Sequence, residues 1–240
     1  MNISAQTATH RFSLNSFQLK IIAIITMIID HVGLLLFPQY AILRIIGRVS
    51  FPIFCFLISE GCIHTSNIKK YLFRLGLFAI ISQFPFNIFL TGRLFYFRGY
   101  ILDIIPMYFY GLNVFFTLFL GALSIVIAKK MKIYFSVPLI ILLATLAELF
   151  HTDYGAFGVI LIVVYWLLRK NVLHRAIGGS ALCLVNGLIR QSSWNAWPAI
   201  AGIPILLYNG EKGKHSLKYF FYVFYPLHLL IIFLIRIMFF

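Results

Sequence analysis

Long apolar runs, separated by short polar or basic segments, dominate this chain. A helix needs roughly 20 apolar residues to cross the hydrocarbon core of a bilayer, and about nine runs of this kind follow one another. Because the runs are continuous rather than alternating, they indicate helices and not a membrane β-barrel. The pattern predicts an all-α, polytopic integral membrane helix bundle with these spans: Leu19–Phe37, Ala41–Cys62, Tyr71–Leu90, Leu112–Ala128, Ile133–Phe150, Ala156–Leu168, Val172–Ile189, Trp197–Tyr208 and Tyr219–Phe239.

Two segments fit this scheme less simply. Trp197–Tyr208 is short and contains two prolines, so we expect either a kinked helix there or a helix that extends further toward Ser193. Tyr100–Tyr110 is apolar but is interrupted by an aspartate and a proline. It is either a re-entrant or interfacial helix, or a tenth span that would invert the topology of everything after it.

Composition supports a membrane protein and excludes several other classes. The chain is 62% hydrophobic and 11% charged, which is too apolar for a soluble domain of 240 residues. The three cysteines (Cys55, Cys62 and Cys183) lie in apolar runs without metal spacing, so we expect buried thiols, no disulfide framework and no metal site. Residues 1–18 lack the pattern of a signal peptide. We expect a polar cytoplasmic segment over 1–18 and a single transmembrane domain over 19–240.

The net charge of +14 reflects topology rather than nucleic-acid binding, because the basic residues cluster between the apolar runs. With nine spans and a cytoplasmic N-terminus, 14 of the 20 basic residues fall inside and 6 outside, which satisfies the positive-inside rule. A tenth span would remove this bias, so nine spans with the C-terminus outside are preferred. The six basic residues expected on the outer side are all arginines: Arg44, Arg48, Arg93, Arg98, Arg190 and Arg236.

Asp30 and His31 stand side by side deep in the first apolar run. Ionisable residues at such depth usually face a partner or a cavity. Lys20 precedes His31 by eleven positions, which places both on one helix face about 16 Å apart along the axis. Histidine is the side chain best suited to accept a proton near neutral pH. We therefore favour His31 as a general base over a satisfied core histidine, with Asp30 pointing elsewhere.

Arg44 and Arg48 are four residues apart and share a face of the second span. One interpretation is that they snorkel, or that one of them pairs with Asp30. The other is that they form a fixed positive pair that holds an anionic group or a developing oxyanion.

Four further groups have both a structural and a functional interpretation. His228 and Tyr225, beside a proline, line either a cavity or a kinked packing seam. Glu60 and His64 form an ion pair or cap, or else a ligand entrance. Asp153 and Tyr154 form a turn with Gly155, or bind a cationic amine. Residues 209–213, with Lys212, form a solvated turn or contact a phosphate. The motifs GxxxxGK[ST], GxGxxG and HExxH are absent.

Several segments together resemble the TraX family, and the matching residues extend from 19 to about 232. They are Leu19–His31, Leu43–Phe54, Glu60–Gly61, Tyr71–Leu75, Gln83–Asn87, Asp153–Gly155, Tyr208–Gly210 with Gly213, and Phe221–Leu229. The spacing Lys20–x10–His31 also resembles the basic–x10–His signature of the wider transmembrane acyltransferase superfamily.

The resemblance implies a bacterial cytoplasmic-membrane acyltransferase that uses acyl-CoA, with acetyl-CoA as the expected donor. It implies that His31 is catalytic and that Lys20 lies near the CoA end of the path. We expect Lys69, Lys70, Arg74 and Lys212 to attract the CoA phosphates as well.

The family's namesake acetylates the N-terminus of conjugative pilin. The acceptor expected here is an outer-face amine or hydroxyl on a pilin-like peptide, a glycan or a lipid head group. The expected partners are acyl-CoA and membrane lipids, without nucleic acid. The alternatives are a proton-coupled transporter or flippase, and a structural subunit of a pilus or secretion assembly.

Overall fold

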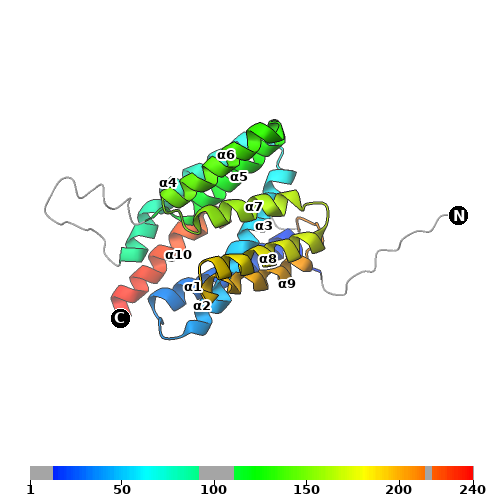
Figure 1. Cartoon of the computed structure of the whole chain (residues 1–240). Coiled ribbons are helices and arrows are strands. Elements are labelled where there is room, and N and C mark those ends of the chain that lie inside the picture. The colour runs from blue at the N-terminus through cyan, green and yellow to red at the C-terminus, as the bar shows by residue number, and fades with distance from the viewer. Residues whose placement is uncertain (1–12, 92–110, 214–217, 240) are drawn as a thin grey trace, which may run out of the picture.

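The computed structural model describes residues 13–91, 111–213 and 218–239, and over these residues the chain is helical (Figure 1). Extended pairing in the described part is limited to two isolated bridges, Leu14 with Tyr208 and Leu112 with Thr152. The predicted all-α class is therefore confirmed. The helices are α1 (Ser16–Leu35), α2 (Ala41–Gly47), α3 (Ser50–His64), α4 (Ile68–Thr91), α5 (Val114–Lys130), α6 (Ile133–Leu149), α7 (Gly155–Leu167), α8 (Val172–Ile189), α9 (Gly202–Leu206) and α10 (Lys218–Phe239), with the 3-10 turns η3 (Ser193–Asn195) and η4 (Trp197–Ala201).

Five helical stretches in the described residues are long and apolar enough to cross a bilayer: Ser16–Leu35, Ala41–His64, Ile68–Thr91, Val172–Ile189 and Tyr219–Phe239. They coincide with five of the predicted spans. The helices α6 and α7 are also apolar but shorter. Together these helices identify a multi-pass membrane protein. The ambiguous segment Tyr100–Tyr110 lies outside the described residues.

The second predicted span is broken between α2 and α3, at Arg48 and Val49. Pro52 explains the position of the break. A proline has no N–H to offer the carbonyl four residues earlier, which here is that of Arg48, and its ring clashes with that carbonyl. Proline is tolerated in the first turn of a helix, and Pro52 is the third residue of α3.

The segment Trp197–Tyr208 is helical up to Leu206, and its geometry changes from 3-10 to α at Gly202. The segment divides into η4 and the five-residue α9, each with its own proline. It packs against α8, where the Ser180 hydroxyl donates to the Ala199 carbonyl at 2.7 Å. Gly202 allows this approach, because a Cβ there would lie 2.2 Å from the Ser180 Oγ.

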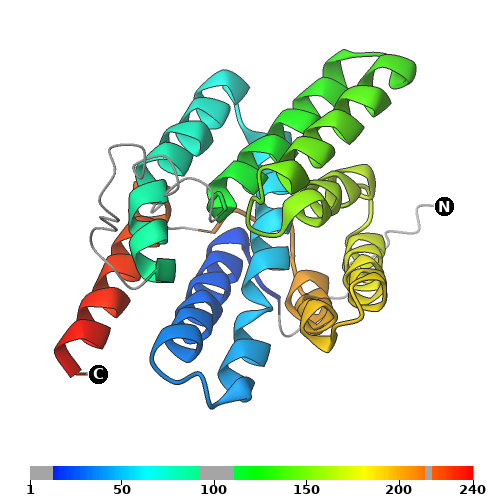
Figure 2. The ribbon, with the colours of Figure 1, turned by 60° about the vertical axis from the view of Figure 1, so that its left-hand side comes forward.

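The helix α3 runs through the middle of the bundle, with α4 and α10 on one side and α8 and α9 on the other (Figure 2). The helices α1 and α10 begin at the same end, where Lys20 lies over the Phe221 ring, and meet again further along through His31 and His228. Both therefore run in the same direction. The outer faces remain apolar, as at Ile133 and Leu188, which suits contact with lipid. The three cysteines are buried thiols, as predicted.

A buried amide network fixes α4 against the start of α5. Gln83 donates to the Gly111 carbonyl and to Asn87, both at 3.0 Å, and accepts from the side chain of Asn113 at 2.8 Å. The Asn113 amide also donates to the Ala79 carbonyl at 2.7 Å, and its oxygen caps α5. Since buried amides must be satisfied, this network sets the position of Gly111, Leu112, Val114 and Phe115, which line a cavity inside the bundle.

Candidate active site

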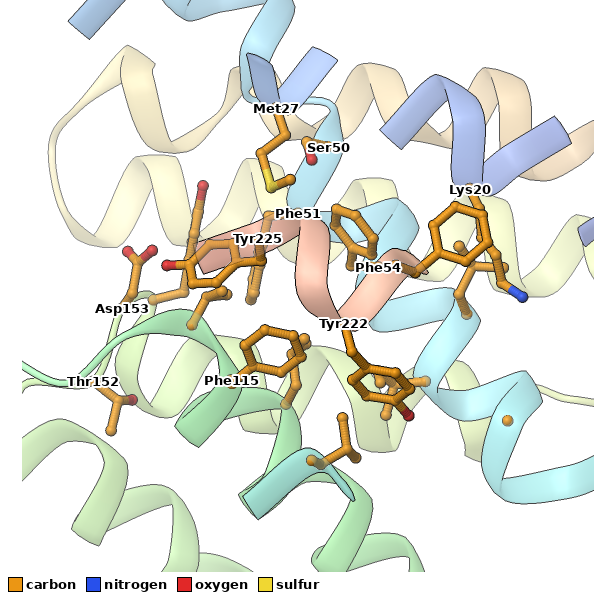
Figure 3. A pocket seen from close by; sticks show the side chains of 18 of the residues that line it. Lys20, Met27, Ser50, Phe51, Phe54, Phe115, Thr152, Asp153, Tyr222 and Tyr225 are labelled. Atoms are coloured by element: carbon orange, nitrogen blue, oxygen red, sulfur yellow. The ribbon is translucent and has the colours of Figure 1, made fainter. Parts of the chain in front are cut away.

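A cavity of about 950 Å³ runs through the bundle. This volume is near the top of the range of about 300–1,000 Å³ that is usual for ligand sites. Lys20 lies at one end and Asp153 at the other, with aromatic side chains between them (Figure 3). We call these the Lys20 end and the Asp153 end. Eleven of the predicted site residues line the cavity: Lys20, Asp30, His31, Arg44, Arg48, Glu60, Arg74, Asp153, Tyr154, Lys212 and Tyr225.

His31 and His228 form a hydrogen-bonded pair whose direction can be assigned. His228 Nδ1 lies 3.0 Å from the Phe224 carbonyl, which can only accept, so Nδ1 carries the proton. In the neutral ring Nε2 is then an acceptor, and His31 Nδ1–H donates to it at 2.8 Å. This leaves the lone pair of neutral His31 on Nε2, because the hydrogen bond of the ring to the described residues is made by Nδ1. His31 is thus oriented as a proton acceptor at the cavity wall.

The ring of His228 is held from several sides. It stacks on Phe224 with an interplanar angle of 3°, and its ring centroid lies 5.6 Å from that of Tyr225. The histidine itself is 4% exposed. Of the two residues predicted to line either a cavity or a packing seam, Tyr225 lines the cavity. His228 does not line it and instead contacts His31.

Asp30 pairs with Arg44, the partnership that the sequence raised as one of two interpretations. The Arg44 guanidinium lies 2.8 Å from the Asp30 carboxylate and also donates to the Asp30 carbonyl at 3.3 Å. Gly47 makes this contact possible, since a Cβ there would lie 2.2 Å from the Asp30 Cβ. The second carboxylate oxygen of Asp30 is buried without a protein partner in the described part of the chain.

Arg48 keeps more of its hydrogen-bonding capacity than Arg44. Its one hydrogen bond is a long contact of 3.5 Å with the Tyr154 hydroxyl, and its Nε is buried without a partner among the described residues. Both arginines lie within electrostatic range of His31. Of the predicted arginine pair, Arg48 is therefore the residue whose guanidinium retains unpaired N–H donors.

Asp153 lies in the loop between α6 and α7, where its side chain points into the cavity (Figure 3). Its backbone N–H donates to the Leu112 carbonyl at 2.7 Å, and the Thr117 hydroxyl donates to the Asp153 carbonyl. Burial raises the pKa of the Asp153 carboxyl to about 6, against the opposing effect of Arg48. Tyr154, next in sequence, has a left-handed backbone with φ of 68° and stacks on Phe51.

The Lys20 end is basic and aromatic. Lys20 and Lys212 line it, together with Arg74, which interacts with the Tyr222 hydroxyl. Residues 207–211 are fixed here by backbone pairing with residues 14–16. Lys69 and Lys70, in contrast, are exposed at the start of α4 and do not line the cavity. Of the four cations expected to attract the CoA phosphates, Arg74 and Lys212 therefore line the cavity, and Lys69 and Lys70 lie outside it.

Arg175 is a buried residue that sequence reasoning missed. It is one of the 14 basic residues expected on the inner side, but it lies in the first turn of α8 and is 4% exposed. Its guanidinium contacts Glu60 at 2.7 Å, and the Tyr208 hydroxyl donates to the same carboxylate at 2.8 Å. The predicted pair of Glu60 with His64 is present at 3.5 Å. Nothing local in the sequence distinguished Arg175 from its neighbour Arg169.

Comparison with known proteins gives a consistent family. A family model described as TraX protein matches residues 16–236. A probable fimbrial assembly protein FimC, serogroup H1, from Dichelobacter nodosus is 31% identical over 242 residues, covering 90% of this chain and 93% of the relative. An uncharacterized protein of Rickettsia prowazekii (strain Madrid E) is 58% identical over 38 residues, covering 16% and 15%. No solved structure matches.

Proposed function

This chain belongs to the TraX family, and from that premise and the geometry of its central cavity we propose that it is a transmembrane acyltransferase. Its donor is acyl-CoA, with acetyl-CoA favoured, and its acceptor is an amine or hydroxyl at the outer face of the bacterial cytoplasmic membrane. The observation that carries the proposal is the oriented His31–His228 pair in the wall of a cavity with a basic end and an arginine-bearing end.

The Lys20 end suits the nucleotide portion of the donor. Lys20, Lys212 and Arg74 place positive charge where the phosphates would enter, and the aromatic rings beyond them suit an apolar thioester arm. With the cytoplasmic N-terminus that the charge distribution predicts, this end faces the cytoplasm. Lys69 and Lys70 lie outside the cavity and contribute at most long-range attraction.

The transfer step uses His31 Nε2 as its base. The acceptor nitrogen or oxygen attacks the thioester carbonyl as His31 takes its proton, and a carbon–nitrogen or carbon–oxygen bond forms. The carbon–sulfur bond then breaks, and His31 returns the proton to the leaving thiolate. His228 accepts the Nδ1–H of His31 throughout and so stabilises the transient imidazolium.

Arg48 is suited to stabilise the tetrahedral oxyanion, because its donors are not consumed by a carboxylate. Arg44 is committed to Asp30, and that pair holds α2 against α1. In this division of roles Arg48 acts on the reacting group, and the Asp30–Arg44 pair acts as its positioning support.

The name of the fimbrial relative favours a pilin-like peptide as the acceptor, and it also raises the alternative of a structural subunit in pilus assembly. The test is acyl transfer by purified protein in nanodiscs with labelled acetyl-CoA. We expect His31→Ala to lower the rate at least about 10²-fold, the lower range for general acid–base catalysis. His174→Ala removes an exposed histidine and should retain the wild-type rate. A His31→Ala protein with full transfer would overturn the mechanism, and a wild-type protein without transfer would favour the structural alternative.

A further inference from the structure

The turn between α5 and α6 brings basic and aromatic side chains together on the surface. It contains Lys130 and Lys132, and two aromatic residues, Tyr134 and Phe135, follow in the first turn of α6. All four residues are exposed, the aromatic ones by 59% and 58%. We call these four residues the α5–α6 corner. Its composition is typical of the boundary between lipid head groups and hydrocarbon, where lysines and amphipathic rings gather.

The corner is held in place by the neighbouring Lys129. The Lys129 Nζ donates to the Cys62 carbonyl at 2.6 Å, which ties the end of α5 to the last turn of α3. The Lys132 Nζ lies 5.9 Å from the centroid of the Tyr134 ring. The centroids of the Tyr134 and Phe135 rings are 4.7 Å apart. The lysine and the two rings therefore form one contiguous group on a fixed turn.

The positive charge of the corner has no acidic counterpart within ion-pair distance in the described part of the chain. The ion pairs found there join Asp30, Glu60 and Glu148 to arginines or a histidine, and none of them includes a lysine. Among the described residues, Lys130 and Lys132 thus keep their charge for an anion from outside the chain.

The short length of α6 places the corner at the level of the lipid head groups. Its 17 residues rise about 25 Å, against about 30 Å for the hydrocarbon core of a bilayer. Its outward face is apolar along the whole helix, as Val137, Ile141 and Leu149 show. A bilayer accommodates such a helix by local thinning, and long basic side chains at its end reach the head-group layer. Lys130 and Lys132 are in this position, with the two rings just below them.

We propose that the α5–α6 corner is a binding site for an anionic phospholipid. Lys130 and Lys132 contact its phosphate, while Tyr134 and Phe135 contact the glycerol and the first carbons of its acyl chains. Lysines near a bilayer surface attract anionic lipids, whereas a zwitterionic head group brings its own cation. The charge distribution of the chain places this turn on the cytoplasmic side, and so the lipid belongs to the inner leaflet. The site is separate from the proposed acyl transfer, because none of the four residues lines the central cavity.

Native mass spectrometry of the full chain in a neutral detergent measures the binding directly. The probes are phosphatidylglycerol and phosphatidylcholine with identical acyl chains. We expect phosphatidylglycerol to bind at least about tenfold tighter, and Lys130→Gln with Lys132→Gln to remove this preference.

The matched control is Lys69→Gln with Lys70→Gln, which should retain the preference. It removes two exposed lysines from the start of α4, close in the chain to the end of α3 that Lys129 contacts. The aromatic residue next to them, Tyr71, lines the central cavity.

Three results would overturn the proposal: equal binding of the two lipids, a preference that survives Lys130→Gln with Lys132→Gln, or an equal loss in both double variants. The last would show undirected attraction by the whole basic surface. Soluble competitors test the kind of ligand. Glycerol 3-phosphate and hexaglutamate, each at the lipid concentration, should leave phosphatidylglycerol bound, because neither has acyl chains to contact the rings. Displacement by the first would indicate a site for free phosphate, and displacement by the second a site for an acidic protein.

Fluorescence quenching tests whether the lipid lies at the corner itself. In nanodiscs, phosphatidylglycerol with brominated acyl chains should quench the added tryptophan of Tyr134→Trp more strongly than brominated phosphatidylcholine at the same mole fraction. The wild type, with its three native tryptophans, gives the background. The difference should vanish when Lys130→Gln and Lys132→Gln are added. Equal quenching by the two lipids in Tyr134→Trp would contradict a site at this position.

Discussion

His31 and His228 are 197 positions apart in the chain, yet His31 Nδ1 donates to His228 Nε2 across 2.8 Å. The bond orients the first histidine, and the Phe224 carbonyl orients the second. The two rings come from α1 and α10 and form a hydrogen-bonded relay. Through these two hydrogen bonds, the Phe224 carbonyl determines that the unprotonated nitrogen of His31 is Nε2.

Loss of His228 should impair the reaction less than loss of His31. His228→Asn removes the ring acceptor for the imidazolium but leaves His31 in place. We expect the acyl-transfer rate to fall about 10–10²-fold, with an unchanged KM for acetyl-CoA, since the general-base residue remains. Steady-state kinetics of the purified variant beside His174→Ala would measure this. An unchanged rate, or a change confined to donor KM, would contradict the relay.

Gly47→Ala should separate α2 from α1. The added methyl group would lie 2.2 Å from the Asp30 Cβ and 2.5 Å from its Cα, so the helices must shift. Overpacking of this kind costs about 1–3 kcal/mol, and the Arg44–Asp30 pair should weaken as well. The midpoint of thermal unfolding in detergent is the readout.

Gly76→Ala is the matched control for this substitution, because its Cβ would meet Phe119 at an ordinary 3.6 Å. It should be neutral or stabilise by up to about 1 kcal/mol. Equal destabilisation by both variants would show that close packing at Asp30 is not the cause.

The two arginine pairs of α8 should differ sharply in their effect on stability. Arg175→Ala would leave the buried Glu60 carboxylate without its main cation, at a cost of about 3–5 kcal/mol. Arg190→Ala breaks the pair with Glu148, whose side chains are 47% and 50% exposed, and should cost no more than about 1 kcal/mol. Thermal unfolding of the two single variants side by side is sufficient, and similar losses would refute the distinction.

Asp153 should make stability depend on pH in a defined direction. Its folded pKa of about 6 lies above the ordinary 3.8, so the fold favours the protonated carboxyl. The resulting stabilisation is complete below about pH 4 and is lost as the pH rises through 6. Asp153→Asn should therefore raise the unfolding midpoint at pH 7.5 and converge with the wild type near pH 4. A difference that stays constant between these values would contradict the assignment.

The sequence predicted the long helices well because their apolar runs are long enough to leave little choice. It also aligned Lys20 with His31, and both line the cavity. It did not locate the break before α3, although Pro52 was the signal. A proline cannot bond to the carbonyl four residues earlier, so the preceding helix ends near that residue. The contacts of His228 with His31 and of Arg175 with Glu60 span 197 and 115 positions. Such pairings depend on how helices pack, and no local pattern specifies them.

The break at Arg48 has an electrical consequence. Because α3 starts anew at Ser50, its N-terminal end lies beside the cavity, which Ser50 and Phe51 line. A helix of this length carries roughly half a positive charge at that terminus, and low-dielectric surroundings screen it little. The backbone thus adds its own positive field to that of the arginines, and no side-chain substitution can remove it.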